Sequence, residues 1–145
     1  MLTIEEYFGP WLGHPDATPE RHFNAEQLVA ACNKLEEIMI ADGVQFPEHK
    51  RTSSKLHWGD ASDISGDTYG GFRPQSCPIG APGSSHKDAE GVDRYDPFEQ
   101  IDSWCMRNQD KLIKCGIHIE HPMATPGWSH WTIRTPKSGR TVFYP

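Results

Sequence analysis

The sequence lacks the features that direct a chain into membranes or onto nucleic acids. No apolar run approaches the ~20 residues that span a bilayer, and the N-terminus has neither the basic region nor the apolar core of a secretion signal. Basic residues cluster only at Lys50-Arg51, and 14 basic against 20 acidic side chains give a net charge of −6. We therefore expect no integral membrane segment, no nucleic-acid partner, and synthesis in a cytoplasm without a signal peptide.

Cysteine is also sparse, and its spacing does not suggest a metal-binding or redox pair. None of the four cysteines belongs to a Cys-x-x-Cys motif, and two of them fall within predicted helices; they are Cys32, Cys77, Cys105 and Cys115. Cytoplasmic proteins keep such thiols reduced. We expect structural thiols, with a disulfide as the less favoured alternative.

The length of 145 residues suits a single domain, 1–145, that buries about two thirds of its unfolded surface. Residues 1–23 are rich in proline and glycine and predict an N-terminal arm with a short helix at 4–8. Residues 45–71 are irregular, and such a long loop is often functional, so we expect one wall of a substrate groove there. The two histidines of the arm, His14 and His22, are expected to have surface or packing roles. The two histidines of the loop, His49 and His57, are assigned no role.

Two longer helices are predicted from their caps and apolar spacing. Asn24 and Gln27 have the spacing of a capping box, and apolar residues then recur at three- and four-residue steps until Gly43 ends the helix. Asp96 is a good N-cap for the second helix, which Gly116 ends. The expected buried residues are Leu28, Ala31, Cys32, Leu35, Ile38 and Met39 in the first helix and Phe98, Ile101, Trp104, Cys105, Leu112 and Ile113 in the second.

Two C-terminal strands are predicted to form an antiparallel hairpin. Residues 117–121 alternate apolar and polar side chains, residues 122–127 form a turn, and residues 128–134 form the partner strand. Alternate residues of a strand share a face, which places together the side chains of Trp128, His130 and Thr132. We expect an α+β fold, in which a small antiparallel sheet carries the functional site and two main helices pack on one side.

A short segment and one distant histidine have the composition of a metal site. His86 and Asp93 lie seven residues apart within the segment 83–93, and His130 follows on the last predicted strand. Catalytic zinc sites typically combine three nitrogen or oxygen ligands with one open position. A His/Asp pair at this separation arises easily by chance among eight histidines and twenty acidic residues, so the surrounding residues decide.

These surrounding residues follow a known pattern. Ser84, His86 and Asp93 match the Ser-x-His-x-x-Gly-x-Ala-x-Asp signature, while Ala89 stands where glycine is usual and Gly91 where alanine is usual. The segment thus resembles the zinc D-alanyl-D-alanine carboxypeptidase family, which shares its fold with lysostaphin-type peptidases and the hedgehog signalling domain. At both differing positions one small residue replaces another, so we expect that the backbone of this segment can still pack closely.

The resemblance extends over residues 69–145, the motif-bearing part of the chain. A Gly-Tyr-Arg segment that precedes the family signature has its counterpart in residues 71–73, at the end of a predicted strand. The closing tryptophan and histidine segment has its counterpart in residues 127–130. The C-terminal run from residue 124 onwards is similar to small peptidases carried by bacteriophages.

The resemblance implies a set of metal ligands and a general base. One zinc ion would be held by His86, Asp93 and His130, and it would polarise a substrate carbonyl and activate water. Family members often carry an acid three residues before the last ligand, but glycine occupies that position here. Glu120 on the preceding strand is therefore the expected general base, with His118 and His121 as substitutes.

The resemblance also implies substrate-binding residues. Arg73 matches a family arginine suited to holding a substrate carboxylate or a developing oxyanion, and a structural ion pair is its alternative role. Ser84 is expected to bond within its loop or to a metal ligand, at the edge of the substrate site. Trp128 and Trp131 would wall the cleft or pack in the core.

The function implied is a zinc-dependent peptidase, encoded by a bacteriophage, that hydrolyses peptidoglycan stem peptides. It would act as a D-Ala-D-Ala carboxypeptidase or an endolysin-type endopeptidase, at the bacterial cell wall or within a virion. The alternative is a catalytically inactive, zinc-stabilised module that binds cell wall or other virion proteins. A metal-free domain with incidental histidines is the third interpretation.

Overall fold

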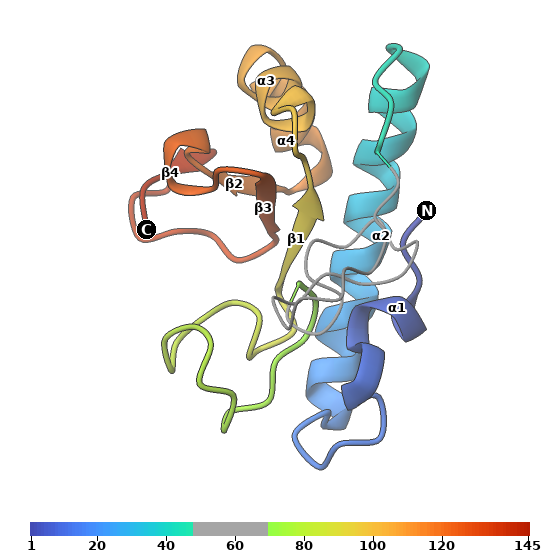
Figure 1. Ribbon diagram of the computed structural model, residues 1–145, viewed down its shortest axis with the longest axis vertical. Helices are drawn as coiled ribbons and strands as arrows, with labels where there is room; N and C mark the ends of the chain where they lie inside the picture. The colour runs from blue at the N-terminus through green and yellow to red at the C-terminus, as the bar shows by residue number, and fades with distance from the viewer. Residues whose placement is uncertain (48–69) are drawn as a thin grey trace.

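The computed structural model describes residues 1–47 and 70–145 and has the predicted α+β architecture. Its elements are α1 (Ile4–Phe8), η1 (Gly9–Trp11), α2 (Pro19–Ala41), β1 (Gly91–Tyr95), α3 (Gln100–Arg107), α4 (Gln109–Cys115), β2 (His118–Glu120), η2 (Pro122–Ala124), β3 (Trp128–Thr132) and β4 (Val142–Phe143) (Figure 1). His49 and His57, and most of the loop expected to wall a groove, lie outside the described residues.

The four strands form one sheet in the order β1-β3-β2-β4. The predicted hairpin is confirmed, because β2 and β3 pair antiparallel, and β1 pairs antiparallel with the other edge of β3. The expectation of a purely antiparallel sheet is wrong, since β4 runs parallel to β2. Residues 133–141 carry the chain back past β2 before it pairs, so β4 enters the sheet in the same direction as β2.

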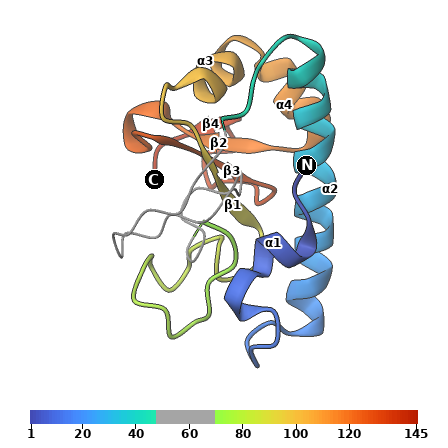
Figure 2. The ribbon, with the colours of Figure 1, turned by 45° about the vertical axis from the view of Figure 1, so that its right-hand side comes forward.

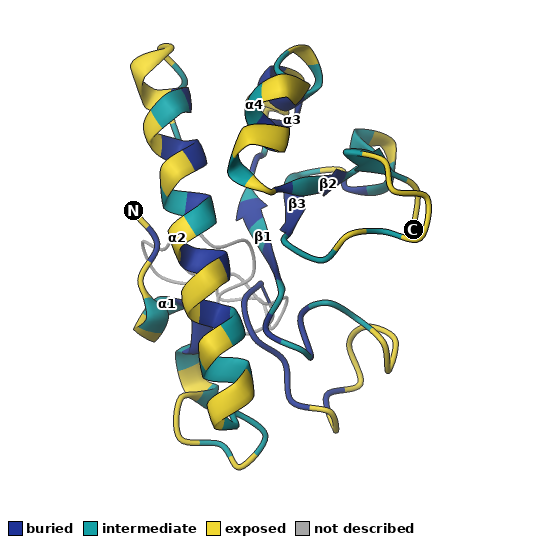
Figure 3. Cartoon of the chain, turned by 180° about the vertical axis from the view of Figure 1, so that it is seen from behind, coloured by how far each residue is buried: buried dark blue, intermediate teal, exposed yellow. Residues whose placement is uncertain are grey.

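The helices lie on one side of the sheet (Figure 2), and residues of the other side line a cleft. Along β1, β2 and β3, the residues that point to the helices are buried, and they include Val92, Ile119 and Trp131. Helix α2 turns its buried stripe toward this layer and its exposed residues away from it (Figure 3). Since side chains alternate along each strand, the residues between these core positions point to the opposite face, and those that line the cleft are Asp93, Glu120, Trp128, His130 and Thr132.

Helix α2 begins earlier than predicted. Thr18 is its N-cap, accepting a hydrogen bond from the backbone N–H of Arg21, and Pro19 occupies the first turn. The prediction of Asn24 as N-cap is therefore wrong, and its side-chain amide donates instead to the carbonyl of Asp88. The predicted apolar stripe is confirmed in its centre, where four residues are fully buried: Leu28, Cys32, Leu35 and Met39. Gly43, with φ +92°, follows the end of the helix as predicted.

The second predicted helix is divided into α3 and α4 by Asn108, whose backbone is not helical (φ −131°, ψ 43°). The prediction of Asp96 as the N-cap residue is wrong, because α3 begins at Gln100 after Glu99, but the Asp96 carboxylate still accepts from the N–H groups of Ile101 and Asp102 in the first turn. Phe98 and Ile113 were expected on the buried side, but they are 76% and 66% exposed. Phe98 precedes α3, and the break at Asn108 rotates α4 relative to one continuous helix.

A buried ion pair joins the sheet to α2. Arg94 of β1 donates from Nη2 to Oε2 of Glu36 at 3.1 Å, and its guanidinium also lies over the rings of Phe46 and Trp131, 4.9 Å from each centroid. Charges this deeply buried need such partners to offset their lost hydration. The pair therefore fixes how β1 sits against α2.

Two sequence expectations concern the rest of the chain. Cys32, Cys77 and Cys105 are buried, which agrees with a structural role for these side chains. Throughout the described ranges, 1–47 and 70–145, every helix is too short or too polar to cross a membrane.

Candidate metal site

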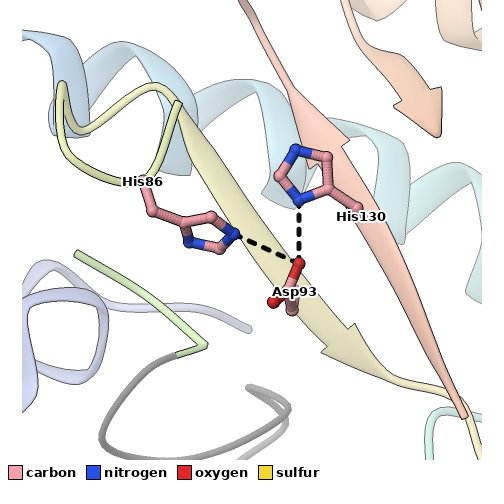
Figure 4. Close-up of side chains that lie close together, drawn as sticks. All are labelled: His86, Asp93 and His130. Carbon is pink, nitrogen blue, oxygen red and sulfur yellow. Dashed lines mark hydrogen bonds and ion pairs between the residues drawn. The ribbon is translucent and has the colours of Figure 1, made fainter. Parts of the chain in front are cut away.

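Two side chains of the 83–93 segment and one distant histidine converge (Figure 4), and all three line the cleft. His86, Asp93 and His130 each offer a ligand atom, and these atoms lie within 4.8 Å of one another. Asp93 Oδ1 is at the centre, 3.3 Å from His86 Nε2 and 2.8 Å from His130 Nδ1. The three predicted metal ligands are thus brought together, and the group could hold a metal ion.

Strand pairing positions two of the three residues. Asp93 on β1 is the direct register partner of His130 on β3, so their side chains leave the sheet on the same face. His86 comes from the turn that precedes β1, and its ring lies at 5.0 Å from the ring of His130. Two neighbouring strands and one tight turn therefore position all three groups without a long flexible loop.

The orientation of the His86 ring is set by the backbone. Its Nδ1 lies 2.8 Å from the carbonyl oxygen of Gly71, which can only accept a hydrogen bond, so Nδ1 carries the proton. The lone pair is then on Nε2, which points to Asp93. Burial lowers the pKa of His86, although the charge of Asp93 opposes this shift, so the neutral, metal-binding form is favoured.

His130 is oriented by Ser85. The Ser85 hydroxyl lies 3.2 Å from Nε2 of His130, while Nδ1 of the same ring faces Asp93. A hydrogen bond on the outer nitrogen of a histidine fixes which nitrogen is left for a metal. Ser85 was not singled out from the sequence, since it occupies a variable position of the pattern.

Asp93 is held in its ionised form. Burial alone would raise its pKa, but in the absence of a metal the charge of a protonated His86 and a hydrogen bond from the His130 ring outweigh this effect, and the pKa lies well below its usual value. Arg73 adds a further contact, from Nη2 to Asp93 Oδ2 at 3.3 Å. An ionised carboxylate between two imidazoles is a donor set that suits a divalent transition metal.

The fit of this donor set to a metal can be judged from its surroundings. The side chains of His86, Asp93 and His130 are 4%, 13% and 9% exposed, so water competes little for them, and each has an outer hydrogen-bond partner. They also face a cleft of about 460 Å³ that is open to solvent. Three protein ligands with an open side are typical of a catalytic metal centre rather than a closed structural one.

Glu120 lies in the same cleft. Ile119 pairs with Trp131, and continuing this antiparallel register sets Glu120 opposite His130. Burial raises the pKa of Glu120, with the charges of His130 and Arg73 opposing and that of Asp93 adding to the shift. The substitutes considered from the sequence lie elsewhere: His118 bonds the carbonyl of Arg140, and His121 stacks on Tyr144.

The residues expected to bind substrate or to wall the cleft are divided between the cleft and the core. Arg73, Ser84 and Trp128 line the cleft. Ser84 accepts a hydrogen bond from the backbone N–H of His86 at 3.3 Å, so it also braces the ligand turn. From the sequence, Trp131 could either wall the cleft or pack in the core; in the structure it is fully buried in the core. Residues 70–73 form no strand, contrary to the predicted strand end, because they bond to Tyr7, His86 and Asp93 instead of joining the sheet.

The two positions that differ from the family pattern have physical explanations. Ala89 adopts φ +59°, a left-handed conformation that glycine adopts without strain, and its methyl group is fully buried. A Cβ atom at Gly91 would lie 2.2 Å from Ser85 Oγ and 3.1 Å from His130 Cε1. Gly91 therefore makes room for the serine that bonds His130.

The N-terminal arm supports the site, which the sequence did not suggest. Buried Tyr7 donates its hydroxyl proton to the carbonyl of Gly91, and its own carbonyl accepts from Phe72. Both histidines expected in the arm contact aromatic rings, since His14 meets Trp11 edge-on and His22 stacks on Phe8, but His22 belongs to α2 and the predicted arm 1–23 therefore ends before Pro19. Only the three-dimensional packing of α1 against residues 70–73 reveals this support.

Searches against protein-family models, curated proteins and solved structures return no match for this chain. The arrangement of His86, Asp93, His130 and Glu120 in one cleft is therefore the basis for a functional proposal.

Proposed function

We propose that this protein is a zinc-dependent peptidase that hydrolyses peptidoglycan stem peptides, as the sequence resemblance implies. The observation that carries the proposal is the convergence of His86, Asp93 and His130 at the floor of an open cleft. Two imidazoles and one carboxylate are common ligands of catalytic zinc. When bound there, zinc would supply Lewis acidity to a peptide carbonyl and lower the pKa of water.

Glu120 is the proposed general base. Its carboxylate faces the cleft on the strand next to His130, and its raised pKa makes it a stronger proton acceptor than an exposed glutamate. It would take the proton of the attacking water and return it to the nitrogen of the leaving amine. The partly buried position keeps it close to the reacting atoms.

Arg73 is the proposed anion-stabilising residue. Its guanidinium lies against Asp93 and on the wall of the cleft, so a permanent positive charge stands beside the ligands. There it would attract the oxyanion that develops during hydrolysis or a substrate carboxylate. Trp128 offers an apolar wall to the peptide on the strand side.

The test is digestion of purified muropeptides by the zinc-loaded and the chelated protein, followed by mass analysis. We expect peptide fragments with zinc and none with chelator. Glu120→Ala should abolish turnover while zinc stays bound, whereas Glu37→Ala, on the exposed face of α2, should leave turnover unchanged. Equal turnover in Glu120→Ala would remove Glu120 from the mechanism.

One observation favours a second candidate, a zinc-stabilised module that binds cell wall or virion proteins without cleaving. Gly127 has no side chain at the position where related peptidases often carry an acid, and its φ of +91° suits glycine. Turnover then depends on Glu120 alone. Zinc binding without new fragments under any metal loading would favour this module, and a protein that takes up no metal would exclude both candidates.

A further inference from the structure

The loop formed by residues 74–83 is a long irregular segment that precedes β1 in the chain (Figure 1), and three of its residues line the cleft: Gly80, Ala81 and Gly83. Three of its ten residues are prolines, which have no backbone N–H donor. Only two backbone hydrogen bonds close turns here, from Cys77 to Pro74 and from Ser84 to Ala81. Several carbonyl groups of the loop therefore need donors from elsewhere.

Arg134 supplies one such donor, from Nη1 to the carbonyl of Gly83, and Lys87 supplies three others. Its Nζ lies 3.3, 3.0 and 3.4 Å from the carbonyl oxygens of Gln75, Cys77 and Gly80, and the residue is 3% exposed. An ammonium group has three N–H donors and no acceptor, so the three carbonyls match its capacity. In the part of the chain that the structure describes, no carboxylate forms an ion pair with Lys87.

The anchored loop packs directly onto Arg73. Gly80 has φ +85°, and a Cβ atom there would lie 2.9 Å from Arg73 Nη1. The loop thus covers one side of the guanidinium, while Asp93 binds it on another. Gly80, Ala81 and Gly83 face the cleft, whose strand side includes Trp128.

We propose that Lys87 is a positioning residue for peptide binding: its ammonium group anchors the 74–83 loop, which shapes the cleft wall and orients Arg73. This inference rests on the proposed function for the identity of the ligand. The proposed role of Lys87 is distinct from metal binding, because all three contacts of its ammonium group go to the loop and none goes to a proposed metal ligand.

The test compares two affinities in the full-length protein. Lys87→Met keeps the length of the side chain and removes its donors, and Lys111→Met makes the same change on the partly exposed surface of α4. The probe is N-acetylmuramyl pentapeptide, titrated calorimetrically into proteins that also carry Glu120→Ala so that the peptide is not hydrolysed, with zinc affinity measured separately by chelator competition. We expect Lys87→Met to weaken peptide binding about tenfold with zinc affinity unchanged, and Lys111→Met to change neither.

A second variant keeps the test decisive if Lys87→Met does not fold. Gly80→Ala alters the same wall of the cleft at an exposed position, because the new methyl group crowds Arg73. It should weaken peptide binding without lowering zinc affinity. Unchanged peptide affinity, or an equal loss of zinc affinity, in these variants would overturn the inference. A wild-type protein that binds the peptide without cleaving it would defeat the proposed peptidase activity alone, and one that binds none would defeat both.

Discussion

Asp93 and His130 are direct partners across the β1–β3 ladder, with Asp93 Oδ1 2.8 Å from His130 Nδ1. The contact is made by backbone register, so two of the three candidate metal ligands come together as soon as these two strands pair. His86 then needs only the tight turn before β1 to complete the group.

Replacing the shared carboxylate should abolish metal binding. Asp93→Asn keeps the size of the side chain but removes the negative charge between the two imidazoles, so we expect zinc affinity to fall by about 100-fold or more. Competition with a chromophoric chelator measures this affinity. Asp110→Asn, on the exposed face of α4, is the matched control, and comparable zinc affinity in both variants would contradict the assignment.

Removing the hydroxyl of Ser85 should weaken metal binding without abolishing it. Ser85→Ala leaves Nε2 of His130 without its protein partner, and loss of such an outer contact typically costs about 10- to 100-fold in metal affinity. The same chelator competition measures it, with Ser103→Ala on the exposed side of α3 as the control. Full affinity in Ser85→Ala would mean that the packing of His130 alone fixes its ring.

Filling the space at Gly91 should destabilise the fold. In Gly91→Ala the new methyl group meets Ser85 Oγ, and overpacking of this kind costs about 1 to 3 kcal/mol of the free energy of unfolding. Adding Ser85→Gly should recover part of this loss, because it removes the clashing atom. Urea denaturation measures both, and Gly13→Ala, which has open space around it, is the control. Additive losses in the double variant would refute the clash.

Asp102 should make stability depend on pH. Burial raises its pKa from 3.8 to about 6, with the charge of Asp96 adding to this effect and hydrogen bonds from Ser129 and Thr125 opposing it. The folded state therefore holds the proton more tightly than the unfolded state, so this group's contribution to stability is complete below about pH 4 and is lost as pH rises through about 6.

Asp102→Asn removes that dependence while keeping an acceptor for Thr125. We expect it to raise the free energy of unfolding at about pH 8 by about 1 to 3 kcal/mol relative to the wild type, and to change it little at about pH 4. Denaturant titrations at the two pH values measure the difference, with Asp110→Asn as the exposed control. The prediction would be contradicted if the difference in free energy of unfolding between Asp102→Asn and the wild type were the same at both pH values.

The sequence predicted the elements that have a clear period or cap, and it failed where distant contacts decide. The stripe of α2 and the β2–β3 hairpin followed from periodicity. The start of α2 was missed because Thr18-Pro19 outweighs Asn24 as a signal, and the break at Asn108 depends on its own backbone conformation. Strand β4 spans only two residues and has no period to detect.

The same division applies to the site. The three ligands were predicted because they belong to a motif, and Glu120 because hairpin register places it opposite His130. Ser85, Tyr7 and Lys87 were missed because their roles depend on contacts with backbone or side chains that the chain brings together only on folding. No spacing rule connects a tyrosine of the N-terminal arm with a carbonyl 84 residues away.

Strand β3 carries Trp131 in the core and His130 in the cleft, on opposite faces of adjacent residues. A slip of one residue against β1 would drive the imidazole into the hydrophobic interior and expose the indole to water. Misaligned chains would therefore lose the convergence of the candidate ligands along with their core. If the proposed metal binds, its uptake during refolding would report correct strand alignment.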